Sequence, residues 1–146
     1  QIVITGKKGA VLEAMPKLSE AGAKKVVELN VSGPFHSPLL KVAGEELGKE
    51  LANVEMNDLK IPYFANASAA KIEDKAQIKD LLEKQVYSPV KWEQTLYELE
   101  KMGVDTIIEV GPGKTIAGFV RKTVPSIKVI GVASPEDIET LKEKLG

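Results

Sequence analysis

Residues 106–115 read TIIEVGPGKT: a short β-branched run, a Gly-Pro-Gly turn and the first residues of a helix. Apolar residues at helical spacing continue over 114–123, and a second β-branched run follows at 128–133. Strand, helix and strand in this order are typical of a unit whose two strands run parallel. This stretch therefore predicts an α/β fold.

The same alternation extends over the rest of the chain. Further β-rich runs predict strands at residues 2–5, 25–31 and 61–66. Helical spacing predicts helices at residues 8–21, 38–53, 75–87, 89–102 and 136–145. Pro16 lies inside the first of these, where proline removes a backbone hydrogen bond and clashes with the preceding turn, so we expect a kink or a later helix start. The whole pattern predicts a largely parallel sheet.

Three Ser-Pro pairs are expected to begin helices. They are Ser37-Pro38, Ser88-Pro89 and Ser134-Pro135. A serine hydroxyl caps the free amides of a first turn, and proline suits the first helical position.

The composition excludes several classes of protein. The chain has 146 residues, 43% of them apolar, which is enough for one domain with a sizeable core. Its formal charge is −1 with the two signs interspersed, so neither nucleic acid nor a membrane surface is an expected partner. The absence of cysteine excludes disulfides, thiolate catalysis and thiolate zinc sites. No apolar run approaches the ~20 residues of a membrane span, and we expect a cytoplasmic location.

The chain enters a β-rich run directly at Gln1, without an initiator methionine or a polar lead-in. A natural start rarely has this form. We therefore interpret the sequence as a fragment of a longer chain.

The single histidine, His36, lies in the segment VSGPFHSPL, residues 31–39. It follows a predicted strand and precedes a predicted helix, which places it at the edge of the sheet where open α/β folds bind ligands. The positive end of the nearby helix would help to keep its ring a neutral proton acceptor. The alternative is an ordinary surface or hydrogen-bonding histidine. A metal site is disfavoured, because it needs further histidine or cysteine ligands.

The turn at 109–115 resembles the end of a phosphate-binding loop. That motif requires glycine at position 108, where this chain has Ile108, and the dinucleotide fingerprint fails at Ile116. We interpret the glycines as turn residues.

Two further patterns are informative. Residues 83–92 predict a corner between two helices, with Val86, Val90 and Trp92 as core residues. None of the serines lies in G-x-S-x-G, the strand–turn–helix elbow that exposes a nucleophilic serine.

Four segments, in order along the whole chain, resemble the malonyl-CoA:acyl-carrier-protein transacylases of fatty acid synthesis and the acyltransferase domains of polyketide synthases. They are QIVITG at 1–6, VSGPFHS at 31–37, QVYSPVKW at 85–92 and EVGPGK at 109–114. Each is weak alone, and the specific signal is their common order and spacing.

The resemblance implies transfer of a malonyl group from coenzyme A to the phosphopantetheine thiol of acyl carrier protein through a serine-bound intermediate. His36 matches the family's general base and acid, and Gln85 matches the residue whose backbone carbonyl orients that histidine. Phe35 resembles the pattern of malonyl-selecting domains and is a candidate substrate-binding residue. Coenzyme A enters as a thioester substrate, and no cofactor or metal is implied.

The resemblance also implies what these residues lack. The family's serine elbow, its oxyanion-hole donors and a carboxylate-binding arginine precede the matched region, so the missing N-terminal portion is an expected partner and the fragment alone is expected to be inactive. The implied fold is an α/β-hydrolase-like core with an inserted ferredoxin-like subdomain. Residues 1–32 would be the last part of the insertion, and residues 33–146 the C-terminal part of the core.

Two rival interpretations remain. One is a non-catalytic α/β binding module that retains the fold without the nucleophile. The other is an unrelated enzyme with a phosphate loop, against which Ile108 argues.

Overall fold

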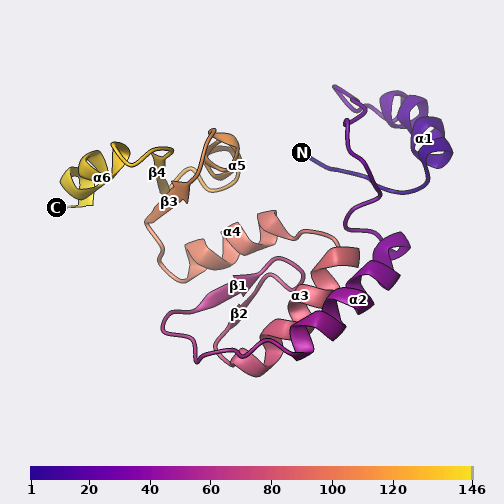
Figure 1. The fold of residues 1–146 in the computed structure, drawn as a ribbon. Coiled ribbons are helices and arrows are strands. Elements are labelled where there is room, and N and C mark those ends of the chain that lie inside the picture. Colours follow the sequence, from indigo (N-terminus) through magenta and orange to yellow (C-terminus); the bar gives the residue numbers. More distant parts are fainter. Residues whose placement is uncertain (146) are drawn as a thin grey trace. The chain divides into compact units, whose positions relative to one another are not determined.

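The computed structural model describes residues 1–145, which divide into two compact units (Figure 1). The first unit is Gln1–Val90, and the second begins at Lys91. The first contains α1 (Lys8–Glu20), η1 (Pro38–Leu40), α2 (Lys41–Ala52), β1 (Tyr63–Ala65), β2 (Ala70–Ile72), η2 (Lys75–Gln77) and α3 (Ile78–Tyr87). The second contains α4 (Trp92–Lys101), β3 (Thr106–Val110), α5 (Thr115–Thr123), β4 (Lys128–Val132) and α6 (Asp137–Leu145).

The second unit contains the predicted strand–helix–strand arrangement. Strands β3 and β4 pair in parallel from Thr106↔Lys128 to Val110↔Val132, and α5 connects them. The core of this unit is formed by buried aliphatic side chains, with partly buried aromatic and aliphatic residues packed around them: Leu96, Val120, Val124 and Ile127, surrounded by Trp92, Leu99, Ile107, Ile116 and Val129. The α/β class with a parallel sheet is therefore confirmed.

In the first unit, α2 packs along α3, and β1 and β2 form an antiparallel hairpin. The hairpin packs on α3 through Ala65, Ile72 and Ile78. The prediction of a strand at 61–66 is correct in place, but the strand is shorter and its partner is antiparallel. The cause is local: the tight turn after Ala65 reverses the chain at once, with Ala69 at a positive φ of 57°.

The predicted strands at 2–5 and 25–31 are wrong for residues 1–145 of this structure. Both segments lack strand structure, and their apolar side chains are exposed, with Ile2 at 95% and Val31 at 63%. A β-rich sequence becomes a strand only when a neighbouring strand binds its amides and carbonyls. No such neighbour lies beside them in the part of the chain that the structure describes. The ferredoxin-like insertion therefore stays a prediction.

The helix starts differ from those that the Ser-Pro pairs predicted. Ser88 ends α3 in an extended conformation, because the residue before proline is pushed away from helical angles. Helix α4 then begins only at Trp92, and Val90 is 43% exposed rather than part of the core. Ser37 does stand at the N-cap of η1, but its hydroxyl donates to the Pro34 carbonyl instead of capping the helix.

A carboxylate organises the start of α6 instead of the Ser134 hydroxyl. Oδ2 of Asp137 accepts hydrogen bonds from the backbone amides of Ala133 and Ser134, at 2.9 and 3.0 Å. These amides hold the pKa of the Asp137 carboxyl below its usual value. Helix α1 runs from Lys8 to Glu20 with Pro16 inside it, so of the kink or later start expected at Pro16, the later start is wrong.

Among residues 1–145, no helix combines the length and the apolar character that crossing a bilayer requires.

Leu96 in α4 has no solvent-exposed surface, so Leu96→Ala removes a fully buried side chain and leaves a cavity. We expect the free energy of unfolding to fall by about 2–5 kcal/mol in urea titrations of the 146-residue chain. Met102→Ala is the matched control, because Met102 is 51% exposed and its truncation should change the stability by less than ~0.5 kcal/mol. Equal losses in the two variants would contradict this assignment of the core.

Candidate active site

His36 occupies a tight loop just before η1. Its φ of 58° is in the left-handed region, which a residue with a side chain adopts only when its surroundings hold it there. The loop is fixed from within by Ser37, a buried residue whose hydroxyl donates to the Pro34 carbonyl at 2.7 Å. It is fixed from outside by the His36 amide, which donates to the Val86 carbonyl at 3.2 Å.

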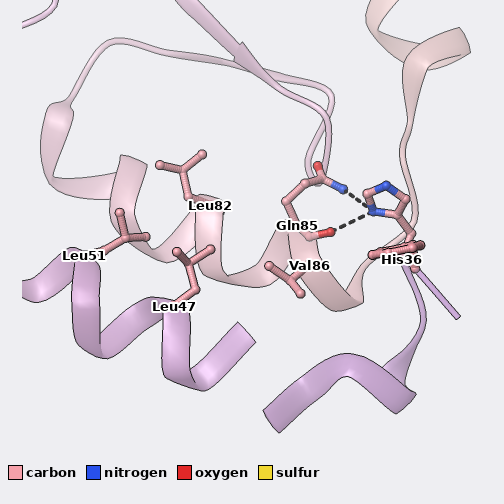
Figure 2. Close-up of a pocket in the computed structure, with 7 residues that line it drawn as sticks. His36, Leu47, Leu51, Leu82, Gln85 and Val86 are labelled. Carbon is pink, nitrogen blue, oxygen red and sulfur yellow. Dashed lines mark hydrogen bonds between the residues drawn. The ribbon is translucent and has the colours of Figure 1, made fainter. Parts of the chain in front are cut away.

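The ring of His36 is bound to the same helix end. Nδ1 lies 2.9 Å from the backbone carbonyl oxygen of Gln85 (Figure 2). The last carbonyls of a helix have no partner within the helix. His36 therefore supplies donors to two consecutive carbonyls near the end of α3, one from its amide and one from its ring.

This bond fixes the tautomer of the neutral ring. A carbonyl oxygen can only accept, so Nδ1 must carry the hydrogen. The other nitrogen, Nε2, is then an unprotonated acceptor, and His36 as a whole is exposed. Among residues 1–145, Gln85 alone forms hydrogen bonds with the ring. We expected a helix N-terminus to act on the ring, but the helix end to which it bonds is the C-terminal end of α3.

The side chain of Gln85 has a different partner. Its Nε2 donates to the Ser88 carbonyl at 3.1 Å and lies 3.4 Å from Nδ1 of His36, which cannot accept a hydrogen bond while it carries its own hydrogen. The side-chain oxygen is buried without a hydrogen-bond partner. Gln85 therefore contacts Nδ1 of His36 through its backbone carbonyl, while its side-chain amide binds Ser88.

A pocket of about 510 Å³ opens beside the ring. Its walls are mostly aliphatic and come from the His36 loop, α2 and α3; they are Phe35, His36, Leu47, Leu51, Leu82, Gln85 and Val86. Figure 2 shows that Leu47 and Leu51 come from α2 and Leu82 from α3. Phe35 is 51% exposed at this pocket, so it is placed where a substrate-binding residue could act. The pocket offers an apolar environment next to one proton acceptor.

The glycine turn in the second unit serves as a turn, as the mismatches with phosphate loops suggested. Gly111 and Gly113 have positive φ angles of 127° and 102°, which glycine adopts without strain. The carboxylate of Glu109 accepts the first free amides of α5, from Ile116 at 2.9 Å and from Ala117 at 3.1 Å. A phosphate would need these amides, and they already bind an anion.

The role of Glu109 was missed in the sequence. Its only signal there is an acidic residue within a β-branched run, seven residues before the first amide that it binds. Across residues 1–145, no group of three His, Asp or Glu side chains is arranged to hold a metal ion.

The acyl transferase domain model matches residues 1–143, so the chain belongs to the acyl transferase domain family. Among curated relatives, a Bacillus subtilis (strain 168) protein named malonyl CoA-acyl carrier protein transacylase is 44% identical over 148 residues, covering 99% of this chain and 47% of that protein. A protein of the same name from Staphylococcus aureus is 38% identical, covering 98% of this chain and 46% of its own length. The chain thus spans about half the length of these relatives.

Solved structures of transacylases are also similar to this chain. The crystal structure of MCAT from Streptococcus pneumoniae superposes with a TM-score of 0.88 at 37% identity, covering 95% of this chain and 45% of that one. The complex titled as a type II PKS acyl-carrier protein with its malonyl-transacylase has a TM-score of 0.91 at 29% identity, again covering 95% and 45%. The resemblance to transacylases that four sequence segments indicated is confirmed.

The tautomer of His36 can be observed directly, because the chain has a single histidine. With ¹⁵N-labelled histidine, at a pH where the ring is neutral, we expect two-bond ¹⁵N–¹H spectra to show a protonated Nδ1 and an unprotonated Nε2. The bond to the Gln85 carbonyl is the reason. A predominant Nε2–H form would show that this bond is absent in solution.

Proposed function

We propose that this chain supplies the general base of a malonyl-CoA:acyl-carrier-protein acyltransferase. The observation that carries the proposal is the bond from Nδ1 of His36 to the Gln85 carbonyl, which leaves Nε2 free to accept a proton. Support comes from the names of the relatives and from the structural neighbour that holds an acyl-carrier protein. The serine nucleophile would belong to the half of the family length that this chain does not span.

In the first half-reaction, Nε2 of His36 accepts the proton of the serine hydroxyl as the oxygen attacks the thioester carbonyl of malonyl-CoA. The tetrahedral intermediate collapses, the C–S bond breaks, and Nε2–H returns the proton to the thiolate of coenzyme A. A malonyl ester of the serine remains. The ring acts first as a base and then as an acid, as in other serine acyl transfers.

The second half-reaction runs the same steps in reverse. Nε2 removes the proton from the phosphopantetheine thiol of acyl carrier protein, and the sulfur attacks the serine ester. The C–O bond breaks, and the proton passes to the serine oxygen. Throughout, Nδ1–H stays bonded to the Gln85 carbonyl, which holds the ring in one orientation without an aspartate.

The pocket beside the ring suits the acyl chain and the adjoining thioester. Its aliphatic walls offer an apolar surface to the acyl chain, and Phe35 stands next to His36 in sequence. We assign Phe35 a role in selecting the acyl group.

His36→Ala removes the proton acceptor and leaves the buried core untouched, because His36 is exposed. In a protein of full family length that contains residues 1–146, we expect kcat/KM for malonyl transfer to fall by about 10²–10⁴-fold. The measurement is the rate of malonyl transfer from malonyl-CoA to holo-acyl carrier protein. Circular dichroism should show unchanged folding. A wild-type rate in this variant would remove His36 from the mechanism.

Gln85→Ala tests which atom of Gln85 matters. The variant keeps the backbone carbonyl that binds Nδ1 and loses only a side chain whose amide is bound to Ser88. In the same assay, we expect kcat/KM for malonyl transfer to fall by less than about tenfold. The small decrease follows from loss of the hydrogen bond that the Gln85 side chain makes to the chain after α3. A loss as large as that of His36→Ala would show that the side chain, not the carbonyl, orients the ring.

A further inference from the structure

Gly44 of α2 lies directly against α3. This glycine is the only residue of α2 that is buried. A Cβ atom built on it would lie 2.5 Å from Cδ1 and 2.6 Å from Cε1 of Tyr87, and 3.0 Å from the backbone oxygen of Glu83. Ordinary contacts of such an atom begin at 3.4 Å. A side chain at position 44 would therefore require the Tyr87 ring to move and the backbone of α3 at Glu83 to shift by a few tenths of an ångström.

Gly48, one turn further along α2, is different. A Cβ atom there would meet only the side chain of Glu83, chiefly its carboxylate group. That flexible side chain can rotate away into solvent, because Glu83 is only partly buried. The two glycines share one helix and one neighbouring helix, yet backbone and ring atoms oppose only Gly44.

The spacing of these helices sets the geometry of the His36 ring. His36 leads through η1 directly into α2, while both of its hydrogen-bond acceptors, the carbonyls of Gln85 and Val86, lie near the end of α3. Glu83 and Tyr87, which oppose Gly44, bracket these two carbonyls in the sequence of α3. A shift of this turn relative to α2 therefore moves the carbonyls relative to the ring.

We propose that Gly44 is a positioning residue for acyl transfer: its missing side chain lets α3 come close enough to α2 for the Gln85 carbonyl to hold the His36 ring. The inference rests on the proposed function of His36. The tolerance is narrow, because the 2.9 Å bond leaves the normal range after about 0.3 Å of lengthening. At position 44, a Cβ atom calls for about 0.4 Å from the backbone oxygen of Glu83, the difference between 3.0 Å and ordinary contact at 3.4 Å, and the Tyr87 ring must move as well.

The test is Gly44→Ala in a protein of full family length that contains residues 1–146. We expect kcat for malonyl transfer to fall by about tenfold, because a misplacement of about 1 Å can cost about 10²-fold and the backbone shift required here is less than half as large. The diagnostic kinetic parameter is kcat rather than KM, because α2 and α3 also form walls of the pocket. Gly48→Ala is the matched control and should keep the wild-type kcat.

A second readout does not depend on activity. In Gly44→Ala, ¹⁵N spectra of the neutral His36 ring should show a lower fraction of the Nδ1–H tautomer, whereas Gly48→Ala should keep the wild-type fraction. The signal of His36 is identified by its loss in His36→Asn. This readout separates two failures: if the wild-type protein transfers no malonyl group, the proposed function fails, while the tautomer still reports on the role of Gly44.

A second substitution should relieve the clash. Tyr87→Ala removes the ring atoms that oppose position 44, so Gly44→Ala should lower kcat much less in the Tyr87→Ala background than in the wild type. This comparison of the two backgrounds also applies if Gly44→Ala alone does not fold, because the added Tyr87→Ala substitution should then restore its folding. The proposal is overturned if folded Gly44→Ala keeps the wild-type kcat and the wild-type fraction of the Nδ1–H tautomer. It is also overturned if Gly48→Ala lowers kcat as much as Gly44→Ala does. The third contrary result is a Tyr87→Ala background that restores neither the kcat nor the folding of Gly44→Ala.

Discussion

The hydrogen bond between Nδ1 of His36 and the Gln85 carbonyl is the constraint on which the candidate site depends. It joins two segments 49 residues apart, fixes the tautomer of the ring and leaves Nε2 unprotonated. The carbonyl is available because the last turn of a helix leaves its oxygens without partners. The main chain of α3 thus holds the ring in one tautomer and orientation, a role that a carboxylate has in many hydrolytic triads. A neutral carbonyl orients the ring without adding a charge beside it.

Helix ends recur as the points where distant residues are fixed. The end of α3 binds the amide and the ring of His36, the start of α5 binds the Glu109 carboxylate, and the start of α6 is organised by Asp137. At α3 and α5, an unpaired backbone group of the helix finds a partner outside it, whereas at α6 the helix's own Asp137 binds two amides that precede the helix. At α3 the partner is the candidate catalytic residue itself. A single hydrogen bond therefore both provides a partner for a free carbonyl of α3 and orients the candidate base.

Local sequence patterns predicted the helices and the parallel pair β3–β4 well, because both depend on periodic burial of apolar residues. They failed at residues 2–5 and 25–31, where a strand needs a pairing partner that no local pattern supplies. The link between His36 and Gln85 came from the family resemblance, since nothing in a spacing of 49 residues indicates contact. Gly44 could not be recognised either. In sequence alone, a glycine inside a helix is expected to lower helix stability by about 1 kcal/mol relative to alanine. The reason for glycine at position 44 is visible only from the packing of the neighbouring helix.

The central claim is that Nε2 of His36 faces a serine hydroxyl supplied by the rest of a family-length protein. The most direct measurement is a crystal structure of a protein of that length containing residues 1–146. We expect a serine Oγ within roughly 2.6–3.2 Å of Nε2, with Nδ1 still bonded to the Gln85 carbonyl. A structure in which Nε2 is enclosed by other side chains, with no serine oxygen beside it, would contradict the account.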